Sequence, residues 1–267
     1  GRGMLKHLGT NDKPLVHIEN ASASGSAAFR HACIEVASGM ADVALVVGVD
    51  KPQPRWHRAN TGIQGLADDA IVPFTHFALL TDSYARRHDV SAEDIALVAV
   101  KNHRNGAANP NAQRQQVRTL DEVLGGRPVS GSLTSLQCCP VGEGAAAVVV
   151  ASETAIKRLA VDSSKPVRVT ASASCVEVAG QTGADALITE KTIADALGQA
   201  GHQAGDLDVI ELHDAFTIEE LQYVDAMGLT KPGESVHWLR DGAFDIGGRV
   251  SISPSGGLIA MGHPLGP

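Results

Sequence analysis

Three polar turns of this sequence carry residues whose types suit nucleophilic and acid–base chemistry. Ser22 follows an apolar run and stands where an alanine-rich segment begins. The first turn of a helix has free N–H groups and a positive dipole end, so an anion formed at Ser22 would be stabilised there. His213 and His263 lie in two further turns, and imidazole is suited to acid–base work because it titrates near neutral pH.

Each of these residues also has an ordinary structural interpretation. Ser22 or its neighbour Ser24 can serve only as the N-cap of the following helix. The chain contains 11 histidines, and most histidines in any protein are surface or core residues. Periodicity does not show that Ser22, His213 and His263 converge, so the residues alone leave both interpretations open.

The elements that must position these turns alternate along the chain in an α/β pattern. Short runs rich in Val and Ile predict strands, and longer amphipathic stretches predict helices. Ser91 followed by Asp94 predicts a capping box, and Gly39 and Gly106 stand where helices are expected to end. The expected strands are Leu15–Glu19, Val43–Val49, Ala145–Ala151, Val167–Ala173, Val209–Leu212 and Arg249–Ser253; the expected helices are Ser24–Ser38, His76–His88, Ser91–Gly106, Thr189–Ala200 and Thr217–Met227.

The polar stretch 162–165 predicts a boundary between two halves, residues 1–161 and 166–267. Residues 15–21 and 208–215 both read as a strand, an acidic residue and a polar turn into a helix. A duplication explains this similarity, and so does coincidence in so short a match. Because the sequence opens without a start-like segment and stops within a predicted loop, we expect it to be an internal piece of a longer protein.

Composition limits the classes of function. Hydrophobic residues make up 43% of the 267 residues, and the formal net charge is −8 with no basic run, which argues against nucleic acid as a partner. No apolar run has the length of a membrane span, and no signal peptide is visible. The four cysteines lack a C-x-x-C spacing, so we expect reduced thiols, no metal site and a cytoplasmic protein.

Several motifs, in their order along the chain, resemble the thiolase superfamily and its sterol-carrier-protein-type branch. They are the segment around Ser22, the stretch 101–113 (KNHRNGAANPNAQ), Cys139-Pro140 with 142–147, the HDAF at 213–216, and the SPSGG and GHP motifs within 253–264. The resemblance implies two similar halves in a layered αβαβα fold that is normally dimeric. It also implies that the family's opening and final segments, with a second reactive cysteine motif, are absent here.

The resemblance also implies roles for single residues. Ser22 matches the family's nucleophilic cysteine, which an acyl-CoA thioester acylates. His263 resembles the base that removes the nucleophile's proton, and His213 the residue that orients a water or shapes the oxyanion hole. In the same turn as His263, Ser255, Gly256 and Gly257 are expected to contact the pantetheine arm of coenzyme A. The implied substrate is a CoA thioester, with no covalently bound cofactor, and several members of the branch use a small OB-fold, zinc-ribbon partner subunit.

Serine in place of cysteine leaves three interpretations open. The first is an engineered substitution that traps substrate in an ordinary thiolase. The second is a natural relative with other chemistry, such as acyl-CoA retro-aldol cleavage or serine-based acyl transfer. The third is a subunit that binds acyl-CoA or a partner without catalysis. In the family resemblance, retro-aldolases use tyrosines near the positions of the two histidines, and neither Tyr84 nor Tyr223 matches, so the sequence favours acyl transfer.

Overall fold

The computed structural model describes residues 2–10, 12–51, 73–162, 164–176 and 184–267, which form two compact units. The first unit combines residues 1–51, 144–169 and 264–267, and the second combines residues 52–143 and 170–263. Both therefore draw on segments far apart in the sequence. The predicted boundary at 162–165 stays a prediction.

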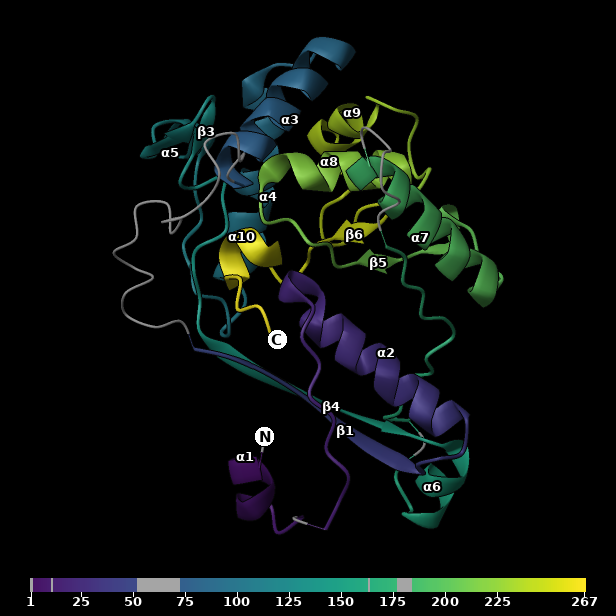
Figure 1. Ribbon diagram of the computed structural model, residues 1–267. Helices are drawn as coiled ribbons and strands as arrows, with labels where there is room; N and C mark the ends of the chain where they lie inside the picture. Colours follow the sequence, from purple (N-terminus) through teal and green to yellow (C-terminus); the bar gives the residue numbers. More distant parts are fainter. Residues whose placement is uncertain (1, 11, 52–72, 163, 177–183) are drawn as a thin grey trace. The chain divides into compact units, whose positions relative to one another are not determined.

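The first unit is built on a two-stranded antiparallel sheet (Figure 1). Strand β1 (Val43–Asp50) pairs with β4 (Gly144–Ala151), from Val43 opposite Ala151 to Asp50 opposite Gly144. Helix α2 (Ser24–Ala37) packs along both strands, and the short helices α1 (Arg2–His7) and α6 (Glu153–Arg158) complete the unit. Strands β1 and β4 and helix α2 confirm the predictions for 43–49, 145–151 and 24–38.

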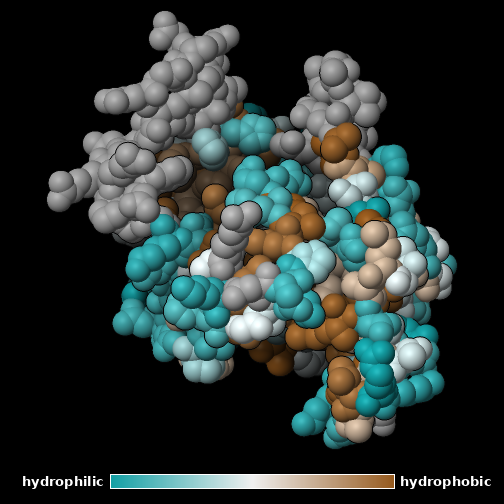
Figure 2. Space-filling model, turned by 60° about the horizontal axis from the view of Figure 1, so that its bottom comes forward, coloured by the Kyte–Doolittle hydropathy of each residue, from teal (hydrophilic) through white to brown (hydrophobic). Residues whose placement is uncertain are grey.

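Close backbone packing in this unit requires glycine at one strand position. The carbonyl of Gly266 approaches Gly48 so closely that a Cβ at Gly48 would lie 2.1 Å from its oxygen. The sheet itself carries exposed apolar side chains, among them Leu45, Val49 and Val149, and apolar surface is visible in the space-filling view (Figure 2). The first unit therefore has little buried core of its own among the described residues.

The second unit surrounds helix α4 (Ala92–Ala107), which contacts α3 (Pro73–His88), α5 (Leu120–Leu124), α8 (Thr217–Ala226), α9 (Ser235–Arg240) and α10 (Gly257–Met261). Helix α7 (Ala184–Ala200) packs on α8 (Figure 1). Two small sheets accompany these helices: β2 (Pro128–Ser130) with β3 (Leu133–Thr134), antiparallel, and β5 (Val209–Ile210) with β6 (Ser251–Ile252), parallel.

The core of the second unit is aliphatic and tightly closed. Its fully buried side chains include Ile95, Ile218, Leu221, Ile252 and Ile259. The capping box at the start of α4 is confirmed, because Ser91 Oγ accepts from the Asp94 backbone N–H and Asp94 Oδ2 accepts from that of Ser91. The helix runs through Gly106 to Ala107, so the prediction that it ends at Gly106 is wrong by one residue.

Two predicted strands are wrong. Residues 15–19 and 167–173 form no helix and pair with no strand among the described residues. Val16 and Val167 are exposed there. A strand is stabilised by its neighbours' hydrogen bonds, and an apolar run does not supply a neighbour. The predicted strands at 209–212 and 249–253 are confirmed over two residues each, Val209–Ile210 and Ser251–Ile252.

Candidate functional site

The structure brings His213 and His263 together in the second unit. His213 lies between β5 and α8, and His263 follows α10 after Gly262, which adopts a positive φ of 96°. The two Nε2 atoms are 3.2 Å apart, and the rings meet edge to face with centroids 4.9 Å apart. Fifty residues of sequence separate them. At this distance, a hydrogen on either Nε2 atom can form a hydrogen bond to the other Nε2 atom.

A carboxylate holds the other nitrogen of His213. Glu219 Oε1 lies 3.1 Å from His213 Nδ1, and the Glu219 side chain is 2% exposed while His213 is partly exposed. This hydrogen bond raises the pKa of His213 above its ordinary value, against the opposing effect of burial. The sequence motifs did not predict Glu219 as a site residue.

A small pocket opens beside this pair of side chains. Its volume is about 300 Å³, and His213 and Glu219 form part of its wall. Residues of α3, α7 and α8 supply the rest, with apolar groups predominating. They are Phe77, Leu80, Ile188, Thr189, Gln222 and Tyr223. The pocket can take a small apolar group with a polar end directed at the imidazole.

The glycine turn before His263 is held by two acidic side chains. Gly257 has a positive φ of 56°, and the Asp214 carboxyl lies against it so closely that a Cβ at Gly257 would be 2.1 Å from Asp214 Oδ2. The Ser255 hydroxyl donates to Glu211 Oε2 at 2.7 Å, and the Ser255 N–H donates to Glu211 Oε1 at 3.0 Å. Ser255 is therefore engaged with Glu211, and its contact with a pantetheine arm stays a prediction.

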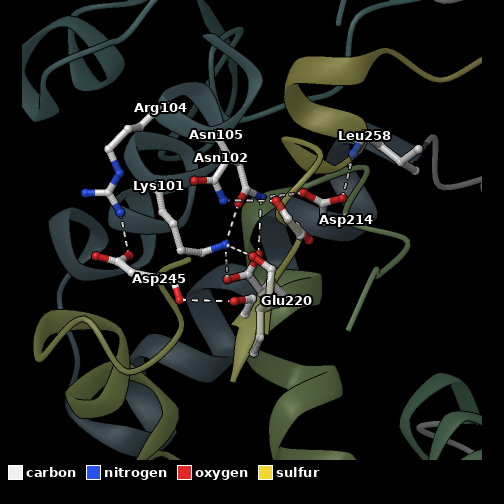
Figure 3. A network of polar contacts seen from close by, with 11 residues as sticks. Lys101, Asn102, Arg104, Asn105, Asp214, Glu220, Asp245 and Leu258 are labelled. Carbon is white, nitrogen blue, oxygen red and sulfur yellow. Dashed lines mark hydrogen bonds and ion pairs between the residues drawn. The ribbon is translucent and has the colours of Figure 1, made fainter. Parts of the chain in front are cut away.

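A buried polar network of the second unit includes Asp214, the residue after His213 (Figure 3). Lys101 Nζ lies 3.1 Å from Glu220 Oε1 and donates to the carbonyl of Ile252 at 2.7 Å. Asn102 Nδ2 donates to Asp214 Oδ2 at 2.6 Å and to Glu220 Oε2 at 3.2 Å. These four polar side chains are at most 3% exposed.

The network joins the two histidine turns. Asp214 follows His213 directly, and its Oδ1 accepts from the Leu258 backbone N–H of α10 at 2.7 Å. Burial raises the pKa of Asp214 well above its ordinary value, and the neighbouring charge of Glu220 raises it further. Lys101 and Asn102 fall among the buried positions of α4, and polar residues at apolar helix positions were the sequence signal that could have revealed them.

Ser22 lies in the first unit, within a single 3₁₀ turn (Ala21–Ala23) that leads into α2. In this turn, Ser24 Oγ accepts from the Asn20 N–H and donates to the Ala21 carbonyl, both at 2.7 Å. Ser22 is exposed and precedes the start of α2, and its role as a nucleophile stays a prediction. Its approach to the histidines stays a prediction.

Two further observations bear on the chemistry. Within the described ranges, no group of three or more His, Cys, Asp or Glu side chains is arranged to hold a metal ion. None of the helices in the described part of the chain is long and apolar enough to cross a membrane. The arrangement that the second unit offers is thus a carboxylate, two imidazoles and an apolar pocket.

Comparison with known proteins gives matches over most of the chain. The family model "Thiolase, N-terminal domain" matches residues 2–122, and "Thiolase C-terminal domain-like" matches residues 184–267. The benzoylsuccinyl-CoA thiolase subunit BbsB of Thauera aromatica is 36% identical, over 100% of this chain and 71% of its own length. Sterol carrier protein 2 of Gallus gallus is 33% identical over 99% of this chain, which spans about half (52%) of that relative.

Solved structures share the fold. The structure described as "Ltp2-ChsH2(DUF35) aldolase" superposes with a TM-score of 0.73 at 20% identity, covering 90% of this chain and 65% of that one. At this identity the likeness concerns the fold alone. The α/β fold predicted from the motifs is confirmed.

Proposed function

The chain belongs to the thiolase family, and from this premise we propose that it transfers an acyl group from a CoA thioester, with Ser22 in the place of the nucleophile. The observation that carries the proposal is the contact between His213 and His263, whose Nε2 atoms are 3.2 Å apart. Two imidazoles in contact can accept, hold and return the proton that acyl transfer moves. The names of relatives such as benzoylsuccinyl-CoA thiolase support a CoA thioester as substrate.

The proposed reaction begins at the thioester carbonyl. Ser22 Oγ attacks the carbonyl carbon, a C–O bond forms, the C–S bond breaks, and the CoA sulfur leaves as a thiolate. His263 takes the hydroxyl proton and returns it to that thiolate, so that CoA leaves as a thiol. Backbone N–H groups and donors linked to His213 stabilise the carbonyl oxygen as its negative charge develops. The proposal includes the placement of Ser22 beside the histidines.

The pocket beside His213 suits the acyl part of the substrate. Its volume of about 300 Å³ suits a short acyl group. Its apolar walls, with Phe77 and Leu80 among them, suit an apolar group better than a polar one. The pantetheine arm is assigned to the turn of Ser255, Gly256 and Gly257 because the family resemblance implies it; the positive φ angles of the two glycines shape this turn against Gly106 and Asp214.

Serine makes this reaction slower than a cysteine would. The pKa of a free cysteine thiol is about 8.5, within reach of activation by a helix N-terminus and an imidazole. A serine hydroxyl is about as weak an acid as water, so Ser22 needs a base to remove its proton as it attacks. The acyl-serine oxoester is also a poorer acyl donor than a thioester. We therefore expect slow acylation at Ser22.

The test is mass spectrometry of the intact protein after incubation with acetyl-CoA or acetoacetyl-CoA. We expect an acyl adduct on the wild-type chain, none on Ser22→Ala, and one that forms about tenfold faster or more on Ser22→Cys, because a thiolate is accessible near neutral pH. Ser26→Ala is the matched control, since Ser26 lies in the first turn of α2, just after the 3₁₀ turn that contains Ser22, and its hydroxyl donates to the Ala23 carbonyl.

The outcomes separate the alternatives. An adduct that persists in Ser22→Ala contradicts the role of Ser22. Turnover of acyl-CoA without any adduct favours aldol-type cleavage, and CoA binding without turnover in both wild type and Ser22→Cys favours a non-catalytic subunit.

We also propose a homodimer and, in addition, a small partner subunit. The likeness to a structure whose description names a DUF35 component supports such a partner, as the family resemblance does. Light scattering of the purified chain tests the dimer. A monomer at micromolar concentration contradicts it.

A further inference from the structure

The hydrogen-bond partners of His213 fix which of its nitrogens carries a proton. A carboxylate only accepts hydrogen bonds, so the 3.1 Å contact with Glu219 requires the hydrogen to reside on His213 Nδ1. In the neutral ring, Nε2 then has a lone pair, and it faces His263 Nε2 at 3.2 Å. With His213 in this tautomer, the hydrogen between the two Nε2 atoms must come from His263.

Glu219 cannot easily turn away from this contact. The Tyr223 hydroxyl donates to Glu219 Oε1 at 2.8 Å, and the Phe216 N–H donates to Glu219 Oε2 at 2.9 Å. Tyr223 is one helical turn further along α8, and the Phe216 contact belongs to the capping arrangement at the start of that helix. With 2% exposure, the carboxylate is held from three directions.

We propose that Glu219 is a positioning residue that holds the Nδ1–H form of His213 and so makes His213 and His263 a relay for one shared proton. The inference rests on the proposed function, because the relay serves acyl transfer. When His263 takes the nucleophile's proton on Nδ1, the hydrogen that its Nε2 shares with His213 can pass to His213 Nε2. The positive charge then lies on the imidazole that touches Glu219.

The other titratable groups around His213 do not replace Glu219. Burial raises the pKa of Cys139 to about 12, so this residue stays a neutral thiol. Asp214 is turned toward Asn102 and the Leu258 N–H, and burial raises its pKa well above the ordinary value. Tyr223 donates its hydrogen to Glu219. Glu219 is thus the charged partner in contact with the ring.

The test uses the full chain with ¹⁵N-labelled histidine, followed by NMR from pH 5 to pH 9, with His213→Asn to assign the signal. In wild type we expect a fixed Nδ1–H tautomer for His213. In Glu219→Gln we expect a mixture of tautomers and a titration midpoint lower by about 1 pH unit, because the negative charge beside the imidazole is gone. An unchanged tautomer and midpoint in a folded Glu219→Gln protein overturns the proposal.

Tyr223→Phe provides a second variant, in which we expect the titration midpoint of His213 to shift in the opposite direction. Loss of the tyrosine donor leaves Glu219 Oε1 to His213 alone, which strengthens their hydrogen bond and raises the midpoint by a smaller amount. This variant keeps the proposal testable where Glu219→Gln fails to fold. A midpoint that falls or stays constant in Tyr223→Phe contradicts the proposal.

The pH profile of acyl-adduct formation supplies the kinetic readout. We expect its limb at lower pH to move with the NMR midpoint, toward lower pH in Glu219→Gln and slightly toward higher pH in Tyr223→Phe. A limb that stays fixed while the NMR midpoint moves contradicts the relay. Absence of an adduct in every variant, Ser22→Cys included, contradicts the proposed function, and the NMR result still decides the role of Glu219.

Discussion

Two strand-to-helix turns with similar sequences behave differently in this molecule. Residues 15–24 lead into α2 of the first unit, and residues 208–217 lead into α8 of the second. In the second turn, Asp214 and the nearby Glu219 are at most 2% exposed, and β5 pairs with β6 just before the turn. In the first turn, Glu19 and Ser22 are exposed, and the preceding residues pair with no strand in the described part of the chain.

The two turns show how burial changes the effect of a hydrogen bond from a backbone N–H to a carboxylate. Glu19 Oε1 accepts from the Ala21 N–H at 2.8 Å in an exposed position, where water offers the same hydrogen bond to both groups. Asp214 accepts from the Leu258 N–H at 2.7 Å with no exposure, so that contact also fixes the distance between two segments. We infer that the buried carboxylates of the second turn tie it to other segments, whereas the exposed side chains of the first turn make only local hydrogen bonds.

The largest effect is expected from Lys101→Met in the buried network. The substitution removes the ammonium group 3.1 Å from Glu220 and leaves carboxyl groups without a cation in a closed core. Removal of one partner of a buried ion pair costs about 3–5 kcal/mol of the free energy of unfolding. Urea denaturation followed by circular dichroism measures the loss.

The control for this prediction is Lys157→Met, which removes an exposed ion pair of the first unit. Lys157 lies 3.5 Å from Glu153, with both side chains more than three-quarters exposed. Such pairs contribute little because water and salt screen them. Equal losses in the free energy of unfolding from the two substitutions would contradict the prediction that the buried network contributes more to stability than the exposed ion pair.

A smaller, pH-dependent effect is expected from Glu220→Gln. Burial raises the pKa of both Asp214 and Glu220, so the folded state binds their protons more tightly than the unfolded chain. Their contribution to stability is complete below the ordinary carboxyl pKa of about 4 and is lost as the pH rises through the folded values.

In Glu220→Gln, one of these carboxyl groups is gone and the charge that helps to raise the pKa of Asp214 is removed. We therefore expect its free energy of unfolding to fall less between pH 5 and pH 8 than that of wild type. Urea denaturation at intervals of one pH unit measures the two slopes. A steeper fall in the variant would show that the network gains stability from ionisation rather than losing it.

Local signals predicted the helices well. The residues that start and stop a helix are its own neighbours, as at Ser91 and Asp94, whose capping box forms as expected. The strands were harder, because Leu15–Glu19 and Val167–Ala173 have suitable residues but no partner strand among the described residues. Pairing depends on segments far away in the sequence, and a local pattern does not contain it.

The site was predicted in part. The motifs identified His213 and His263, and the structure places them in contact, but the sequence did not identify Glu219. A glutamate three residues after Phe216 looks like an ordinary helix cap, and it does accept from the Phe216 N–H. Its second function depends on the rotamer that also directs Oε1 toward His213, which spacing alone does not reveal.

The smallest effect is expected from Ser24→Ala at the first turn. The Ser24 hydroxyl accepts one hydrogen bond and donates another within four residues, and both groups are exposed. Water replaces such contacts at little cost, so we expect a local loss of about 0.5–1 kcal/mol. This corresponds to roughly two- to fivefold faster hydrogen exchange at the N-terminal amides of α2.

Ser38→Ala, which removes a hydroxyl that donates to Glu35 at the other end of α2, should leave those amides unchanged. Because the loss is confined to one turn, global unfolding by urea should respond less to Ser24→Ala than to Lys101→Met. A global loss as large as that of Lys101→Met would mean that the first turn, too, is tied to a buried core.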